Sequence, residues 1–274
     1  MLVRGLFVVA AIVLAGGGAR AEDAPAPCRF EPIGGARVAT VLDERTLRLT
    51  DGREVRLAGL APLALPPAKA PNPRRAAEAA KADLSASALG KDVRLQRFGA
   101  EHDRYGRTVA YVFADEKDSA SSLQQALLAH GHGLAADRFP DRACAASFLA
   151  AEQTARAAKL GLWADPYYDI RQADDPAAIS AERGRFAIVE GRVLSVRASG
   201  GTIYVNFGRR WSEDFTVTIL KRNERTFIAA GIEPKTLAGH RIRIRGWVDE
   251  RGGPWIEAAR PEQIERADRH SDRH

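Results

Sequence analysis

Two arginines stand in short patterned segments and carry a side chain suited to binding an oxyanion. Arg56 lies in the short alternating segment 54–57, and Arg107 ends the segment 103–107, which reads D-R-Y-G-R. A guanidinium group suits this task because its fork of N–H donors can bond two phosphate oxygens at once. Cleavage of a phosphodiester would also need carboxylates that hold a hard divalent metal and a carboxylate that activates water. Whether the chain carries those carboxylates decides between phosphate binding and phosphate chemistry.

The elements that must position these arginines are short strands and three helices. Residues 38–64 predict three strands, with Asp51-Gly52 as the hairpin dipeptide between the second and the third. The order β-β-β-α-β-β-α-α is typical of a five-stranded Greek-key barrel of the OB type, so we expect an α+β first domain over residues 28–165. Further strands are expected at 91–95 and 107–113, and helices at 74–89, 121–130 and 141–160.

A second unit follows an acidic stretch of low apolar periodicity. We interpret residues 166–182 as an acidic linker and 266–274 as a charged tail. Between them, residues 183–265 predict three strands, a short helix and two strands, which is again the OB order. The second domain is therefore expected to be a small OB-like β-barrel, and the alternative is another small barrel or sandwich. The expected strands are 186–196, 202–208, 215–220, 241–248 and 255–259, with a helix at 222–230.

The first residues have the pattern of a secretory signal peptide. Arg4 precedes an apolar run over 6–15, and Ala19-Arg20-Ala21 forms a small-residue exit, so residues 1–21 are interpreted as a cleaved signal. The alternative is an uncleaved membrane anchor. Cleavage would leave 39 of the 41 Lys+Arg and all 35 Asp+Glu, a net charge of +4, and no membrane span. This predicts a secreted or periplasmic protein.

The chain has two cysteines, Cys28 and Cys144. In an oxidising compartment they are expected to form one disulfide that ties the start of the first domain to its last helix. A closed loop of more than a hundred residues corresponds to roughly 4–5 kcal/mol in the chain-entropy model. Two buried free thiols are the alternative.

Residues 36–165 resemble the thermonuclease (staphylococcal nuclease-like) family. The family pattern V-x-D-G-D-T followed by R-L-x-x-I-D-x-P-E aligns without a gap with the segment from Val41 to Ala64, and its D-x-Y-G-R motif aligns with 103–107. The late Gly161-Leu162-Trp163 also falls where the family has it. The resemblance implies that Arg56 and Arg107 grip phosphate, as the arginines at these positions do in the family.

The same resemblance implies that the family's catalytic centre is degenerate here. Arg45 stands where the family has a calcium ligand, and Ala61 and Ala64 replace a second ligand and the glutamate that activates water. Because calcium needs six or more oxygens, we expect no calcium and no metal site. Losing the general base removes a contribution of roughly 10²- to 10⁴-fold. A rescue by acids close in sequence is the alternative; the candidates are Asp43, Glu44, Glu101 and Asp103.

The second domain carries a separate basic signal. Residues 183–274 hold 18 Lys+Arg and 12 Asp+Glu, a net charge of +6. Alternation along 241–245 places three arginines on one strand face, and rings beside Arg209 and Arg210 could stack bases as in single-strand-binding barrels. The alternative is a solvated basic face. The candidate nucleic-acid-binding residues are Tyr204, Arg209, Arg210, Arg241, Arg243 and Arg245.

These patterns predict an exported thermonuclease-like protein that does not catalyse and that acts as a nucleic-acid- or anion-binding or structural module. The expected partner is single-stranded nucleic acid or another polyanion. Two alternatives stay open: a metal-dependent phosphodiesterase with relocated acids, and a cell-envelope module that binds another protein.

Overall fold

The computed structural model describes residues 28, 30–63, 72–97, 99, 102–114, 121–139, 142–210 and 212–268. The predicted signal peptide, 1–21, and most of the predicted charged tail lie outside these residues. Glu101, Ala64 and Trp211 also lie outside them.

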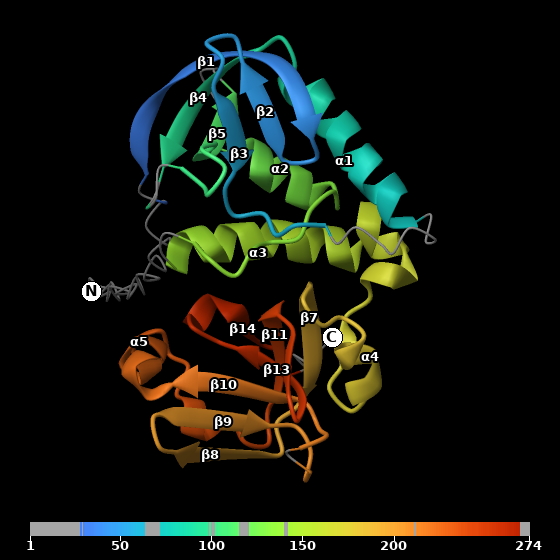
Figure 1. Cartoon of the computed structure of the whole chain (residues 1–274), viewed down its shortest axis with the longest axis vertical. Coiled ribbons are helices and arrows are strands. Elements are labelled where there is room, and N and C mark those ends of the chain that lie inside the picture. The colour runs from blue at the N-terminus through green and yellow to red at the C-terminus, as the bar shows by residue number, and fades with distance from the viewer. Residues whose placement is uncertain are drawn as a thin grey trace, which may run out of the picture.

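The first domain is a closed five-stranded barrel with the strand order β1-β2-β3-β5-β4 (Figure 1). Adjacent strands in the barrel are antiparallel, except that β3 and β5 pair in parallel. This is the pairing of an OB barrel, so the predicted fold is confirmed. The strands are β1 (Glu31–Asp43), β2 (Thr46–Leu49), β3 (Glu54–Leu57), β4 (Asp92–Arg97) and β5 (Thr108–Ala114).

Alternation explains why the hairpin of β2 and β3 closes over the core. Leu47, Leu49, Val55 and Leu57 are buried and point into the barrel, whereas the residues between them face outward or are partly covered. Gly52 has a φ of +89°, which a tight hairpin requires and which a residue with a Cβ rarely adopts. The dipeptide Asp51-Gly52 is thus the turn that the sequence predicts.

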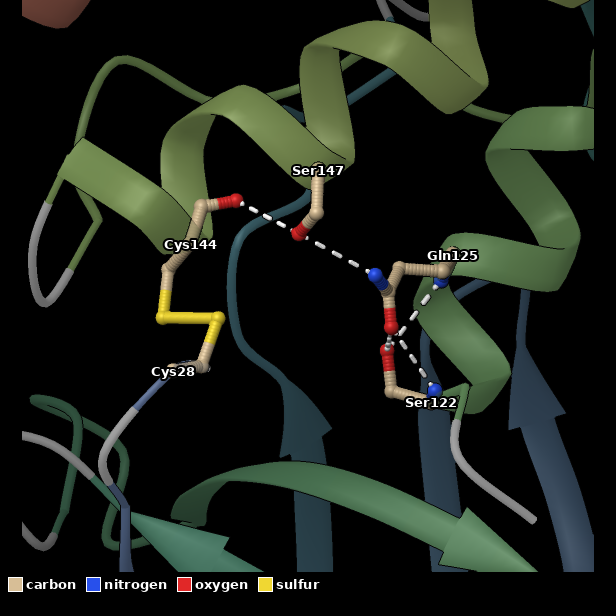
Figure 2. The surroundings of a disulfide bond; sticks show 5 residues. All are labelled: Cys28, Ser122, Gln125, Cys144 and Ser147. Atoms are coloured by element: carbon tan, nitrogen blue, oxygen red, sulfur yellow. Dashed lines mark hydrogen bonds between the residues drawn. A yellow bond between two sulfur atoms is a disulfide. The ribbon is translucent and has the colours of Figure 1, made fainter. Parts of the chain in front are cut away.

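Three helices pack on this barrel: α1 (Asn72–Ala88), α2 (Leu123–Ala129) and α3 (Arg142–Ala157). Helix α2 starts at a capping box, in which the Ser122 hydroxyl accepts from the Gln125 N–H and the Gln125 side chain accepts from the Ser122 N–H. Gln125 also donates to Ser147 on α3, which ties the two helices together (Figure 2).

A disulfide joins Cys28 to Cys144, as predicted (Figure 2). Cys144 is buried on α3, and Cys28 precedes β1, so the bond fixes the entrance of the barrel to its last helix. The two residues are 116 positions apart, so the closed loop spans most of the first domain.

The second unit repeats the OB pairing with two of its strands broken. β7 and β8 together occupy the place that β1 has in the first barrel, and β11 and β12 together occupy the place of β4. β9 pairs with β10, and β10 pairs in parallel with β13, as β3 does with β5. The breaks divide one barrel into two sheets, β12-β13-β10-β9-β8 and β14-β11-β7-β6. Its elements are β7 (Phe186–Arg192), β8 (Ser195–Ser199), β9 (Thr202–Asn206), β10 (Thr216–Leu220), α5 (Glu224–Ala229), β11 (Arg241–Trp247), β12 (Asp249–Arg251), β13 (Gly253–Glu257) and β14 (Ile264–Arg266).

The segment predicted to be an acidic linker, 166–182, is folded. It holds a 3₁₀ turn at Pro166–Tyr168, the edge strand β6 (Arg171–Gln172) and the helix α4 (Pro176–Ser180). β6 pairs in parallel with β7, and Ile179 is fully buried in the second core. One of its acids, Asp175, caps α4 by accepting from the Ala178 N–H, and Glu182 pairs with Arg171 at 2.6 Å. Just before the segment, Asp165 accepts from the Tyr167 N–H.

Helix α3 lies between the two units in Figure 1, and both pack against it or the segment that follows it. A third apolar cluster joins them: Leu63 of the first domain, Trp163 and Tyr168 of the connection, and Phe186 and Ile188 of β7 are buried together. The two barrels thus share a core. Within the described ranges, none of the helices has the length and apolar character needed to cross a membrane.

Candidate anion-binding site

The barrel brings three arginines together at one end. Arg45 is in the turn between β1 and β2, Arg56 is on β3, and Arg107 directly precedes β5. Thr46 pairs with Arg56 across β2 and β3, and Val55 pairs with Thr108 across β3 and β5. Burial is the main cause that lowers the pKa values of Arg45 and Arg56, and the positive charge of Arg107 contributes to both shifts.

Arg107 is held by the aspartate of its own motif. Its Nε donates to Asp103 Oδ2 at 2.8 Å, and its Nη2 lies 2.7 Å from the same oxygen. The other Asp103 oxygen accepts from the N–H groups of Tyr105 and Arg107 and so shapes the turn, in which Gly106 has a φ of +77°. Burial alone would raise the pKa of Asp103, but these bonds outweigh it and hold the pKa below its ordinary value.

Arg56 is less fully compensated. Its Nη1 donates to Thr46 Oγ1 at 2.9 Å and lies 3.6 Å from Asp43 Oδ2, beyond hydrogen-bond distance. Burial and the charge of Arg107 lower its pKa, although Asp43 acts in the opposite direction. Arg56 and Arg107 both keep a partly exposed side chain, and their shared role in phosphate binding stays a prediction.

Arg45 is the third arginine at this end of the barrel. The sequence identifies it only as the residue at a position where the family has a calcium-binding carboxylate. Its Nη1 donates to the Leu60 carbonyl at 3.3 Å, and its Nε lies 3.4 Å from Glu44 Oε1. Burial and the charge of Arg56 lower the pKa of Arg45 to about 10, so its guanidinium stays charged at neutral pH.

These residues do not fit a calcium ion. A guanidinium occupies the place of one expected ligand, and Ala61, the place of another, is only 4% exposed within the cluster that joins the two barrels. In the part of the chain that the structure describes, no three His, Cys, Asp or Glu side chains gather so that they could hold a metal. Two of the candidate replacement acids already have partners: Asp43 accepts from the Arg45 N–H, and Asp103 accepts from Arg107.

A shallow cleft of about 430 Å³ borders Arg107. Its lining includes Tyr105, whose ring is 67% exposed and lies 5.2 Å from the Arg107 guanidinium carbon and 4.8 Å from that of Arg104. An exposed ring flanked by guanidinium groups is a surface on which a base could stack. Arg53 and His102 also line the cleft.

The structure corrects one member of the predicted basic face of β11. Arg241, Arg243 and Arg245 each form an ion pair with a carboxylate, and only Arg245 is fully buried among the three. Arg241 and Arg243 both pair with Glu190, at 2.7 and 2.6 Å. Arg245 is only 1% exposed and cannot contact nucleic acid in this fold. Alternation reveals which residues share a face but not what covers it.

Arg245 instead forms the centre of the interface between the barrels. It bonds both carboxylate oxygens of Glu152 on α3 at 3.0 Å, the Ala135 carbonyl at 3.0 Å and Glu265 on β14 at 2.6 Å. Burial would lower its pKa, but the two glutamates outweigh burial and raise it. The sequence signal that could have predicted this pair is Glu152, an acid on the buried face of α3.

The other predicted residues of the second domain remain accessible. Tyr204 on β9 faces outward, and Arg210 is exposed and pairs with Glu213 at 2.9 Å. Trp211 lies outside the described residues, so its stacking role stays a prediction. Trp255 on β13 is not among the predicted residues; its ring centroid lies 5.1 Å from the Arg251 guanidinium carbon.

The first domain is similar in sequence to a known protein family. No curated protein matches the chain in a sequence search. Residues 55–165 match the family model described as staphylococcal nuclease homologue. The matched segment contains Arg56 and Arg107, and in the structure it runs from β3 to the turn after α3. The predicted resemblance is confirmed: this chain contains a staphylococcal nuclease-like domain.

Proposed function

We propose that this protein is an exported nucleic-acid- or polyanion-binding protein whose nuclease-like domain no longer cleaves phosphodiesters. The observation that carries the proposal is the contrast within one site. Arg56 and Arg107, to which we assign the phosphate grip, are present in the chain, whereas Arg45 and Ala61 stand where relatives are expected to hold calcium. Binding needs only the first pair, and hydrolysis needs the missing carboxylates as well.

Export forms part of the proposal. The pattern of residues 1–21 and the disulfide between Cys28 and Cys144 both support a secreted or periplasmic location, since such bonds persist in oxidising compartments. An extended single strand is the favoured ligand, because the exposed Tyr105 ring beside Arg107 could stack a base next to a gripped phosphate.

The test is to incubate a labelled single-stranded oligonucleotide with the purified mature chain, with and without calcium, magnesium or manganese. We expect no cleavage, and salt-sensitive binding that an Arg56→Ala, Arg107→Ala variant loses. The matched control is Arg37→Ala, Arg48→Ala, which removes two exposed charges from the same barrel.

Three outcomes would contradict the proposal. Metal-dependent cleavage abolished in the Arg56→Ala, Arg107→Ala variant would mean that other acids have taken over catalysis. Absence of oligonucleotide binding at any salt concentration would favour the protein-binding alternative. Equal loss of binding in the test and control variants would mean that general basicity, rather than this site, attracts the strand.

A further inference from the structure

Arg45 links the two places from which metal-ligating carboxylates are missing. Its carbonyl accepts from the Leu57 N–H at 2.9 Å, and its side chain reaches the Leu60 carbonyl, one residue before Ala61. The guanidinium therefore lies against the chain that leaves β3. Relatives are expected to obtain a positive charge at this position by binding a metal ion. In this chain the Arg45 side chain supplies a positive charge there.

The hydrogen-bond capacity of Arg45 is only partly used. Its Nε is buried and has no hydrogen-bond partner among the described residues, and Glu44 lies 3.4 Å away without forming that bond. Asp43 is occupied by the Arg45 N–H and by its attraction to Arg56. Since buried polar groups are normally satisfied, Arg45 has donors suited to an additional acceptor.

A second unsatisfied polar group lies nearby. The hydroxyl of Tyr168 is buried and has no hydrogen-bond partner among the described residues, and the side chain is more than nine-tenths buried. Tyr168 shares a buried cluster with Ala61, the residue that follows Leu60, whose carbonyl accepts from Arg45. Tyr168 belongs to the connection between the barrels, outside the segment that matches the family model.

We propose that Arg45 is a built-in substitute for a metal ion, so that Arg45, Arg56 and Arg107 bind a phosphate group without any divalent cation. The proposal rests on the anion-binding function proposed above and specifies its ligand. Three guanidinium groups can surround a tetrahedral anion and donate charge-assisted hydrogen bonds to it. These bonds would replace the coordination that a metal ion provides. The phosphate can belong to a nucleic-acid strand or be free, and the test separates these sources.

The experiment measures the dissociation constant Kd of the full mature chain for two probes, inorganic phosphate and a short 5′-phosphorylated single-stranded oligonucleotide. Each probe is titrated in EDTA and in millimolar calcium. The variants are Arg45→Gln, which removes the charge, and Arg45→Lys, which retains it. Arg48→Gln is the control, because Arg48 is an exposed arginine of the same barrel that pairs with Glu54.

We expect the same Kd in EDTA and calcium for the wild type. Arg45→Gln should weaken binding of both probes by about ten- to a hundredfold, as loss of a charged hydrogen bond does. Arg45→Lys should retain more affinity than Arg45→Gln, and the control should equal the wild type. The melting temperature of each variant is measured as well. If Arg45 had only the structural role of joining the turn to Leu60, its substitution would lower the melting temperature, and the affinities would not follow the order wild type, Arg45→Lys, Arg45→Gln.

Calcium-dependent affinity in the wild type would overturn the inference, as would a folded Arg45→Gln variant that binds both probes like the control. If the oligonucleotide binds through Arg56 and Arg107 but not through Arg45, the proposed function survives and this inference fails. If inorganic phosphate binds in EDTA through Arg45 and the oligonucleotide does not bind, this inference survives and the nucleic-acid function fails.

Discussion

The buried arginine between the two barrels gives a sharp prediction about stability. Arg245→Met keeps the length and apolar stem of the side chain but removes the guanidinium that bonds Glu152, Glu265 and the Ala135 carbonyl. Glu152 is 0% exposed, so it cannot recover its lost bonds from solvent. It would keep the Ala135 N–H at 2.6 Å and Arg156 at 3.2 Å. The variant therefore leaves a buried carboxylate short of positive charge.

Removal of one partner of a buried ion pair costs about 3–5 kcal/mol, because the other charge stays buried and uncompensated. The matched control is Arg241→Met, on the same strand and the same face. Arg241 is partly exposed and pairs with Glu190 at the surface. Its loss should cost less than about 1 kcal/mol, as is usual for exposed pairs.

The assay is urea denaturation of both variants and the wild type, followed by tryptophan fluorescence and by circular dichroism. A second variant, Glu152→Leu with Arg245→Met, removes both buried charges. It should be more stable than Arg245→Met alone, yet less stable than the wild type. The Ala135 N–H and carbonyl would then lack their partners, at about 1–3 kcal/mol each.

Equal losses in Arg245→Met and Arg241→Met would refute the reasoning, because burial would then confer no special cost. So would a double variant that is less stable than Arg245→Met, since the free carboxylate could not be the origin of the penalty. Both results are read directly from the urea midpoints, provided that the slopes agree.

Three further outcomes follow from the same contacts. Phe186→Ala should cost about 3–5 kcal/mol and speed proteolysis between the barrels, since its ring fills their shared core; unchanged proteolysis would contradict this. Cys28→Ser with Cys144→Ser should cost roughly 4–5 kcal/mol, measured against the oxidised wild type. The pKa of Glu265 is lowered, because Arg245 outweighs the opposing effect of burial. Its contribution to stability is therefore present above the unfolded value of about 4.3 and is lost as pH falls through the lower folded pKa. Glu265→Gln should reduce that loss in acid denaturation curves.

The first barrel was predictable because its signals are local. Asp51-Gly52 gives the turn, alternation gives the inward residues of β2 and β3, and the D-x-Y-G-R segment forms a closed set of contacts around Asp103. Each pattern specifies its structure within a few residues. The grouping of Arg56 with Arg107 then follows from the parallel pairing of β3 with β5.

The parts that sequence reasoning missed depend on contacts between distant segments. Residues 166–182 resemble a linker in composition, yet β6 completes an edge of the second unit, and Asp175 caps α4. Arg245 resembles a surface cation, because alternation alone cannot show that Glu152, 93 residues earlier, covers it. Long-range burial, rather than local propensity, determines both outcomes.

The proposed loss of the metal site involves residues that also join the two barrels. Ala61 and Leu63, on the chain that would carry the catalytic carboxylates, are buried in the same cluster as Phe186 and Ile188 of the second barrel. A carboxylate at Ala61 would be taken out of water by that barrel, and an unpaired buried charge is strongly unfavourable. A small apolar residue at position 61 permits the close packing seen in this cluster. The shared core therefore favours alanine over a calcium-binding carboxylate at this position.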